Sequence, residues 1–221
     1  MIEVVGRRER KKQEMRDLIA ATARRLFAER GFDEVSVAEI AREADVAEKT
    51  VFNHFPTKED LFYEGLEPFE DRLLEALRTR PPGQTVAAAF RTFLLEPPPG
   101  ERPSSPAPGT FREITTAIAG SEALQAREQR MFARYTKDVA SLIREELGAR
   151  PSDLQPWVVA NALMGVHRAL VDLVRRRTLA GQDEPKRLAR DVRAEAGRAF
   201  DLLETGLKRY GVKPRKSVHR L

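Results

Sequence analysis

An all-α fold is predicted for this chain of 221 residues by three features of its sequence. Apolar residues recur at steps of three and four through most of the chain, as in residues 9–30, where they form one face of a helix. Helix-capping residues stand at the starts of such segments and glycines at their ends. Runs rich in proline and glycine separate the segments. These features predict helices joined by turns and by one longer loop.

Composition and charge narrow the classes of protein. Hydrophobic residues make up 41% of the chain, enough for a core, and the absence of cysteine excludes disulfide frameworks and thiolate metal sites. The N-terminus lacks the apolar core of a secretory signal, and no apolar run approaches the roughly 18 residues of a spanning helix. We therefore expect a soluble, cytoplasmic protein. Residues 1–65 hold 12 Lys and Arg against 14 Asp and Glu, so the net charge of +5 alone does not indicate a nucleic-acid partner.

Two helices are predicted in the first 44 residues. The first covers about 9–30 and ends at Gly31, a C-cap position. The second covers 36–44 and opens with a capping box, in which the Ser36 side chain accepts from the Glu39 amide and the Glu39 carboxylate accepts from the Ser36 amide.

A helix-turn-helix is predicted over residues 36–54. Residues 45–47 form a three-residue turn, and a third short helix covers about 48–54. Thr57 caps a long fourth helix predicted over 58–80. Two short helices joined by a tight turn, the second with polar outer positions, are typical of this motif.

The third predicted helix has an apolar inner side and a polar outer side. Val51 and Phe55 join Val46 on the inner side, whereas Lys49 and Asn53 point outward. In this motif the second helix enters the DNA major groove, where Asn suits adenine and Lys suits guanine. Hydroxyl, imidazole and ammonium groups beside that face suit phosphates. The candidate DNA-binding residues are Ser36, Val37, Glu48, Lys49, Thr50, Phe52, Asn53, His54 and Lys58.

Several alternatives are open at these positions. Lys49 and Asn53 also fit an ordinary solvated helix face, and His54 could pack against the first or fourth helix. Glu48 either accepts from cytosine N4 or stays clear of the groove. The basic run at 7–12 is either a flexible arm that follows the minor groove or a solvated first helical turn.

Residues 18–62, LIAATARRLFAERGFDEVSVAEIAREADVAEKTVFNHFPTKEDLF, resemble the N-terminal domain of TetR/AcrR-type bacterial transcriptional regulators. The matching positions include Phe27, Gly31, Phe32, Ser36, Val37, Ile40, Ala41, Val46, Thr50, His54, Phe55, Lys58, Glu59, Asp60 and Leu61. The match covers about a fifth of the chain. It implies operator binding through the third helix, phosphate contact by His54, and pairing of two copies through the last two long helices.

Two positions depart from the family pattern. The family usually has Gly where Asp45 stands and Ser where Ala47 stands. Asp tolerates the left-handed backbone of such a turn better than most residues. Ala47 removes the usual hydroxyl cap of the third helix, which costs about 1 kcal/mol. We therefore expect an unchanged fold with a slightly frayed third helix.

The rest of the chain is predicted to form further helices. Their expected ranges are 85–96, 110–120, 122–147, 157–174 and 185–210. Residues 97–109 hold six of the fourteen prolines, which predicts an exposed loop without regular structure.

The last two predicted helices suggest a subunit interface. Residues 157–174 are apolar nearly all round, so this helix needs cover on every side. The final helix presents apolar residues at alternating steps of about four and three, with alanines that permit close approach. They are Leu188, Val192, Ala196, Ala199, Leu203 and Leu207. We interpret the pair as half of a four-helix interface in a homodimer; an internal core seam is the alternative.

The middle helices are predicted to enclose a ligand pocket with a mostly apolar lining. The candidates are Phe90, Phe93, Phe111, Ile114, Phe132, Tyr135, Trp157, Asn161, Met164 and His167. Each taken singly also fits a core position. Asn161 and His167 stand out because polar side chains on an apolar helix need partners. Residues 110–175 resemble the effector domain of actinobacterial members of the family, which implies a hydrophobic or acyl-bearing effector.

The function predicted from these features is that of a ligand-responsive regulator, by default a repressor. The expected division is a DNA-binding domain at 1–62, with 1–8 a flexible arm, an effector and dimerisation domain at 63–210, and a basic tail at 211–221. An enzyme or ligand carrier is a poor alternative, because the three histidines show no metal spacing and no catalytic or cofactor motif occurs. A DNA-binding regulator without a small-molecule effector is the other alternative. No cofactor or metal is expected.

Overall fold

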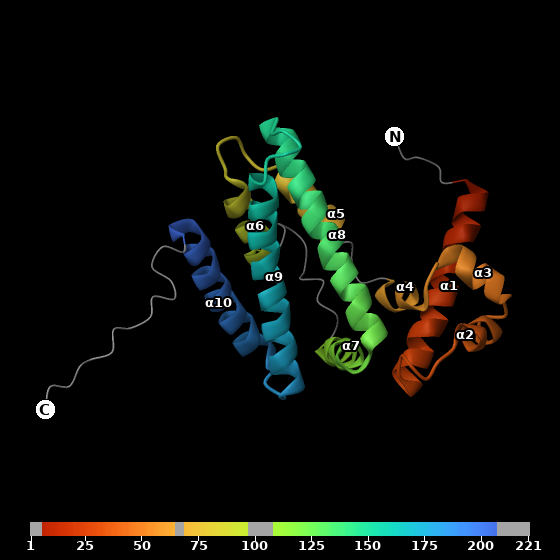
Figure 1. Cartoon of the computed structure of the whole chain (residues 1–221). Helices are drawn as coiled ribbons and strands as arrows, with labels where there is room; N and C mark the ends of the chain where they lie inside the picture. The colour runs from red at the N-terminus through yellow and green to blue at the C-terminus, as the bar shows by residue number, and fades with distance from the viewer. Residues whose placement is uncertain (1–5, 65–68, 97–107, 207–221) are drawn as a thin grey trace, which may run out of the picture. The chain divides into compact units, whose positions relative to one another are not determined.

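The structure of the protein is a computed structural model that describes residues 6–64, 69–96 and 108–206. Ten α-helices and no strand occur in these ranges (Figure 1), which confirms the predicted all-α fold. The predicted basic tail and most of the predicted proline-rich loop lie outside the described residues.

The helices belong to two compact units. The first comprises Met1–Arg72 and Arg102–Tyr135, and the second comprises Leu73–Glu101 and Thr136–Leu221. Helix α8 (Glu122–Leu147) contributes residues to both units.

The first unit begins with the predicted helix-turn-helix. The first four helices of this unit are α1 (Arg7–Arg30), α2 (Val37–Glu43), α3 (Glu48–His54) and α4 (Lys58–Tyr63), of which α2 and α3 form the helix-turn-helix. Helix α1 packs against α2 and α4, and α2 packs against α3. Their shared core also takes in residues of α7 (Pro108–Gly120) and α8. Its fully buried members include Ile19, Val35, Ile40, Val51, Leu61 and Leu124.

The helix ends in this unit follow the predicted capping chemistry. Gly31 has a positive φ of 87°, and its amide donates to the Phe27 carbonyl at 2.9 Å. The Ser36 capping box with Glu39 is present at the start of α2. Thr57 caps α4 as predicted, through a second capping box with Asp60. These local bonds fix where each helix of the motif begins or ends.

The turn between α2 and α3 contains the two departures from the family pattern. Asp45 adopts the left-handed region with φ 54°, the only non-glycine residue to do so within the described ranges. Ala47 is the N-cap of α3 and makes no side-chain capping bond. The left-handed Asp45 and the missing side-chain cap at Ala47 agree with the expectations from the sequence, while the fraying expected for α3 stays a prediction.

Ala47→Ser should raise the free energy of unfolding by about 1 kcal/mol, because the serine hydroxyl would accept from an amide in the first turn of α3. Urea unfolding followed by circular dichroism measures the change. Ala28→Ser, at an exposed position inside α1, is the matched control and should give no stabilisation. A gain of equal size in both variants would mean that capping of α3 is not its cause.

One predicted boundary in this region is wrong. The helix that begins at Lys58 does not continue to Arg80: α4 ends at Tyr63, and Glu64 has an extended backbone with ψ 128°. A separate helix, α5, covers Phe69–Arg78. Gly65 and Pro68 lie between the two helices in the sequence, and both residue types disfavour a helix interior.

Other predicted boundaries also need correction, and the helix predicted over 157–174 covers Gln155–Leu179. Helix α7 begins at Pro108, inside the segment expected to lack regular structure. Proline is tolerated in the first turn of a helix, where an amide has no intrahelical partner. Helix α10 (Pro185–Thr205) ends five residues before the predicted end at Tyr210, because Gly206 with φ 76° is its C-cap.

The second unit is a helical bundle that includes α6 (Val86–Leu95), α9 (Gln155–Leu179) and α10. Helix α10 packs against α9 and α6. Phe90 and Phe200 are fully buried, with ring centroids 6.3 Å apart. Phe200 does not belong to the apolar stripe predicted for α10.

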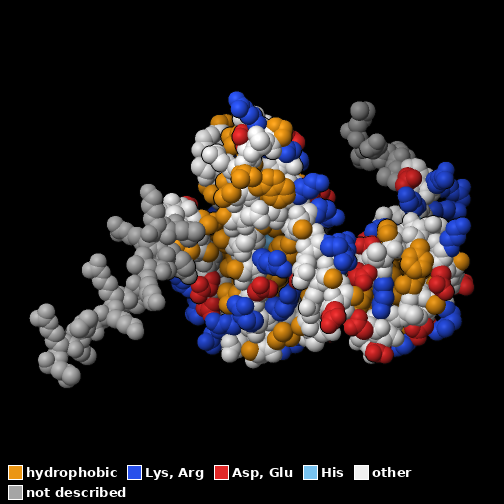
Figure 2. Space-filling model, viewed as in Figure 1, with side chains coloured by type: hydrophobic (Ala, Val, Ile, Leu, Met, Phe, Trp, Pro, Cys, Tyr) orange, Lys and Arg blue, Asp and Glu red, His pale blue; other side chains and the backbone are white. Residues whose placement is uncertain are grey.

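Helix α9 has a large exposed apolar surface. Leu154, at its N-cap, is 73% exposed, and Val158 is 65% exposed, so the described residues of one copy do not supply the cover expected on every side. Figure 2 shows hydrophobic side chains gathered over this end of α9. By length and composition alone, α9 could cross a membrane, contrary to the expectation from the sequence, and 17% of its most apolar window is buried. Arg168 and Asp172 lie within α9, and its other side packs against α10 and α6.

Candidate nucleic-acid interface

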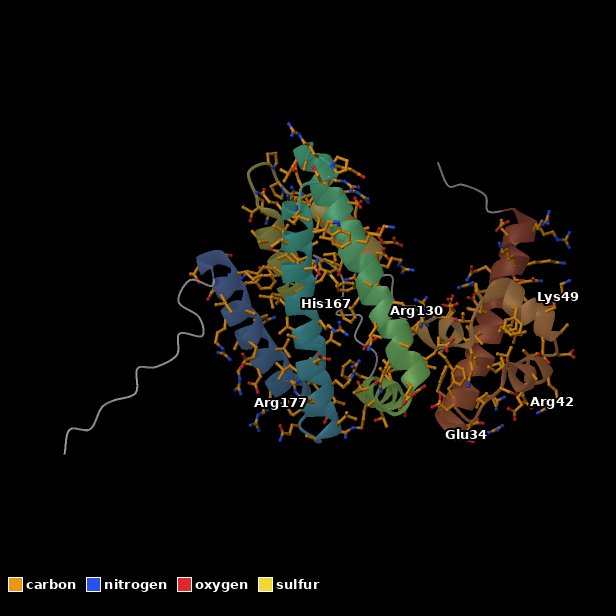
Figure 3. All side chains as sticks on the ribbon, viewed as in Figure 1. Glu34, Arg42, Lys49, Arg130, His167 and Arg177 are labelled. Carbon is orange, nitrogen blue, oxygen red and sulfur yellow. The ribbon has the colours of Figure 1, made fainter. Side chains whose placement is uncertain are left out.

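One side of helix α3 is buried in the domain core, and the opposite side is exposed and mostly polar. Val51 is 0% exposed and Phe55 at the C-cap is 1% exposed, so both anchor α3 in the core. Lys49 and Asn53 are exposed, and Figure 3 shows Lys49 on the side of α3 away from α1. Phe52 on the same outer face is 47% exposed, an unusual position for an aromatic ring. The outer face therefore combines one cation, one amide and one apolar ring with the acid Glu48 in the first turn.

The other candidates around this face have mixed environments. Glu48 is exposed in the first turn of α3, and Thr50 is half-buried. Ser36 is exposed, but its hydroxyl donates to the Glu39 carboxylate at 2.8 Å and accepts from the Glu39 amide. Val37 is half-buried and packs against the core. Ser36 therefore caps the start of α2, and Val37 anchors it to the core.

His54 lies at the edge of the core. Its side chain is half-buried, and its Nδ1 atom is buried without a hydrogen-bond partner among the described residues. Its backbone carbonyl accepts from Arg16 Nη1 at 2.6 Å. The ring is thus held by packing, and phosphate contact through the other nitrogen stays a prediction.

Lys58 is directed toward the turn between α1 and α2. Its Nζ atom lies 4.3 Å from the centroid of the Phe32 ring and donates to the Asp33 carbonyl at 3.4 Å. Burial lowers the pKa of Lys58. A phosphate contact by this ammonium group therefore requires a change of rotamer.

Arg16 ties α1 to the ends of α3 and α4. Its Nε and Nη2 atoms donate to the Glu64 carboxylate at 2.8 and 2.6 Å, in a bidentate ion pair. Its guanidinium also lies 4.2 Å from the centroid of the Phe55 ring. The hydrogen bond to Glu64 is the largest cause of a raised pKa for Arg16. Sequence reasoning missed this residue, although it stands one turn from the predicted apolar stripe of α1.

Arg16→Met should lower the free energy of unfolding by about 1–2 kcal/mol, because the carbonyl of His54 and the Glu64 carboxylate both lose a charged donor. Methionine keeps the aliphatic packing of the side chain. A double-mutant cycle with Glu64→Gln, measured by urea unfolding, should give a coupling energy of about 1 kcal/mol. A coupling energy near zero would show that the ion pair does not stabilise this corner.

Further polar contacts join α4 and the α1–α2 turn to α7 and α8 within the first unit. Arg127 Nη2 donates to Asp60 Oδ1 at 2.8 Å. The Ser121 hydroxyl donates to Asp33 Oδ1 at 2.8 Å. The Tyr63 hydroxyl donates to the Leu124 carbonyl at 3.3 Å. These partners lie far apart in the sequence, so no local pattern could have identified them.

Ion pairs also hold α1 against α2. Arg30 Nη1 lies 2.9 Å from Glu39 Oε1, and Arg25 Nη2 lies 3.0 Å from Glu43 Oε2. The backbone hydrogen bond from Ser36, followed by the bonds from Arg30 and the Ser36 hydroxyl, lowers the pKa of Glu39 to about 2. Several arginines of this domain are therefore already paired with acids.

The predicted pocket residues fall on both units. Phe111, Ile114, Phe132 and Tyr135 belong to the first unit, and Phe90, Phe93, Trp157, Asn161, Met164 and His167 belong to the second. The ten candidates therefore do not form a single lining within one unit.

Burial separates the candidates of the second unit. Phe90 and Met164 are core residues. Trp157 is 43% exposed and Asn161 is exposed, which contradicts an enclosed position for both. The Asn161 side chain donates to the Trp157 carbonyl one turn earlier, at 2.7 Å. Burial lowers the pKa of His167 to about 4, so its imidazole is neutral at pH 7. Among the described residues, no group of three or more acidic or histidine side chains could hold a metal ion.

One family model and two known transcriptional regulators match the chain. The family model described as bacterial regulatory proteins, tetR family, matches residues 19–64. The HTH-type transcriptional regulator TcmR of Streptomyces glaucescens is 33% identical over 93 residues, which cover 40% of this chain and 41% of TcmR. The transcriptional regulator MftR of Mycobacterium tuberculosis is 26% identical over 198 residues, which cover 86% of this chain and 90% of MftR. The chain thus matches less than half of the length of TcmR but most of MftR.

A solved structure shares the fold. The crystal structure of NalD, the secondary repressor of the MexAB-OprM multidrug efflux pump in Pseudomonas aeruginosa, has a TM-score of 0.51 and 22% sequence identity. The match covers 87% of this chain and 96% of NalD. At this identity the similarity concerns the arrangement of helices.

Proposed function

We propose that the chain is a bacterial transcriptional regulator of the TetR family, a cytoplasmic repressor that binds a two-fold-symmetric DNA operator as a homodimer. The observation that carries this proposal is the exposed polar face of α3, seated on the buried Val51 and Phe55. A short helix held in this way can enter a major groove without losing its position in the domain. The protein is on this view a regulator and not an enzyme.

The candidate residues divide into two roles. Lys49 and Asn53 read base edges, because Lys can bond guanine O6 or N7 and Asn can bond adenine N6 and N7. Thr50, His54 and Lys58, beside that face, hold phosphates and set the register of α3 on the duplex. Ser36 and Val37 bring the start of α2 to the DNA backbone, while Glu48 and Phe52 complete the outer face of α3.

The homodimer proposal is supported by the exposed side of α9. One side of this helix packs against α10 and α6, so part of the predicted seam is internal to the chain. The other side exposes Leu154, Val158 and Val159, and also Gly165 and Ala169, whose small size permits close helix approach. A second copy would bury this surface. Two recognition helices would then face half-sites about 34–36 Å apart, or a multiple of that distance.

A small-molecule effector is the remaining part of the proposal. We assign residues 63–210 to effector binding and dimerisation, 1–62 to DNA binding and 211–221 to a basic tail. On α9 the candidates for an effector site with a hydrophobic or acyl-bearing ligand are the buried Met164 and the half-buried His167. If effector and operator favour different conformations, each must weaken the binding of the other by the same factor.

Selection of bound sites from random duplex DNA by the purified protein tests this function. The expected product is a palindrome whose affinity falls steeply with salt, because a dimer neutralises several phosphates in each half-site. Sedimentation of the complex should give two chains per duplex. Recovery of no motif, with binding only at low salt, would contradict a sequence-specific operator reader.

A further inference from the structure

The first two turns of α1 carry a dense group of basic residues. They are Arg7, Arg8, Arg10, Lys11 and Lys12, and all five side chains are exposed. Figure 2 shows Lys and Arg side chains gathered at this end of α1. None of the five has an ion pair or hydrogen bond from its side chain to another residue in the part of the chain that the structure describes. The group is therefore available to an external anion.

The charge of the surrounding domain makes this group exceptional. Residues 1–65 hold 12 basic and 14 acidic side chains, a balance of 12 − 14 = −2, so the net charge of the domain does not by itself favour DNA binding. Five of those 12 cations fall within residues 7–12, beside the single acid Glu9. Arg16, Arg25 and Arg30 are instead occupied by ion pairs with acids of the same domain.

The position of these cations does not favour helix stability. The start of a helix carries a partial positive charge, so acidic side chains stabilise it and basic ones destabilise it. The N-cap Gly6 supplies no side-chain capping bond either. A polyanion bound along these turns would neutralise the repulsion between these cations and the helix start. Anion binding therefore explains the basic cluster, whereas helix stability does not.

Helical geometry places Arg8 and Lys12 on one side of α1 and Arg7 and Arg10 on another. Arg8, Lys12 and Arg16 follow one another at intervals of four residues, so they form one row along α1. Arg16 marks the end of α3, because it donates to the His54 carbonyl. With a rise of about 1.5 Å per residue, Lys12 and Arg8 lie roughly 6 and 12 Å beyond that point on the same row. Arg7 and Arg10 are turned away from Arg8 by at least about 100°.

We propose that Arg8 and Lys12 form a second DNA-contact element, a rigid helical extension that binds phosphates flanking the half-site contacted by α3. This inference rests on the proposed operator binding. Residues 7–12 are helical, so of the two alternatives for this run they form the first helical turns and not a flexible arm that follows the minor groove. Their long cationic side chains reach phosphates instead, which adds affinity and fixes register but carries no sequence information.

A salt series with two matched double variants tests this element. Full-length wild type, Arg8→Gln/Lys12→Gln and Arg7→Gln/Arg10→Gln are titrated against a fluorescent duplex of mixed sequence and against the palindrome recovered by selection. Both variants lose the same charge. Each protomer of the dimer should lose two phosphate contacts, four in all, so the slope of log K against log salt should become shallower by about 3.6 and binding should weaken at least roughly tenfold in 0.1 M salt. Only the Arg8/Lys12 pair should have this effect, and it should be equal on both duplexes.

Three results would overturn the proposal. Equal changes for the two variants would mean that general charge, and not a positioned row, attracts DNA. An unchanged slope for Arg8→Gln/Lys12→Gln, with wild type still binding the palindrome, would refute the extension while leaving the proposed function intact. Absence of DNA binding by the wild type would remove the proposed function and this inference together. Circular dichroism confirms that each variant is folded.

Discussion

Asn53→Ala should abolish the preference for one base pair in each half-site of the operator while leaving the other positions selective. The side chain is exposed on the outer face of α3. Its amide NH₂ can donate to adenine N7 while its amide oxygen accepts from adenine N6, which makes a bidentate pair. Loss of one such pair costs about 1–3 kcal/mol of discrimination, a change of roughly 5-fold to 150-fold. The measurement is the affinity for a panel of operators that differ at single positions.

Thr50→Val is the matched control for this experiment. Thr50 is half-buried in α3, and valine keeps its shape while removing the hydroxyl proposed to hold a phosphate. This variant should weaken binding to every duplex of the panel by a similar factor. If Asn53→Ala also weakened all duplexes equally, Asn53 would contact the backbone and not a base.

Local sequence signals predicted the helix-turn-helix with most of its boundaries. Gly31, Ser36 and Thr57 end or begin helices through bonds to residues three or four positions away, so their patterns are visible without a structure. The left-handed Asp45 and the uncapped Ala47 follow from the same local chemistry. Gly65 and Pro68 also encode the break after α4 locally, but the prediction of one long helix overlooks them.

Contacts between distant segments could not be predicted in this way. The ion pair of Arg16 with Glu64 joins residues 48 positions apart, and that of Arg127 with Asp60 joins residues 67 positions apart. Many arginines and acids in the chain would satisfy such a pair equally well. The burial of Phe200 and the exposure of Trp157 depend likewise on which helices pack together, which helical periodicity alone does not specify.

The protein should become less stable by about 2 kcal/mol between pH 7 and pH 5 because of His167 alone. Burial lowers the pKa of this imidazole from 6.5 to about 4 in the folded protein. The unfolded chain therefore binds a proton at about pH 6.5, before the folded protein does, and protonation favours unfolding. The stabilisation is fully present above pH 6.5 and is lost as the pH falls toward 4, where the total reaches about 3 kcal/mol.

Urea unfolding of His167→Gln across this pH range isolates the effect, because glutamine is polar and does not titrate. The variant should be less stable at pH 7 but should lose the decline attributed to His167. Met164→Leu, a buried apolar substitution on the same helix, should keep the wild-type decline. Glu39 does not contribute to the decline between pH 7 and pH 5. Its pKa is lowered from 4.5 to about 2, so its contribution to stability is lost only below about pH 4.5. If His167→Gln kept the full wild-type decline, the imidazole would be protonated as readily in the folded protein as in the unfolded chain, and its environment on α9 would be far wetter than its burial indicates.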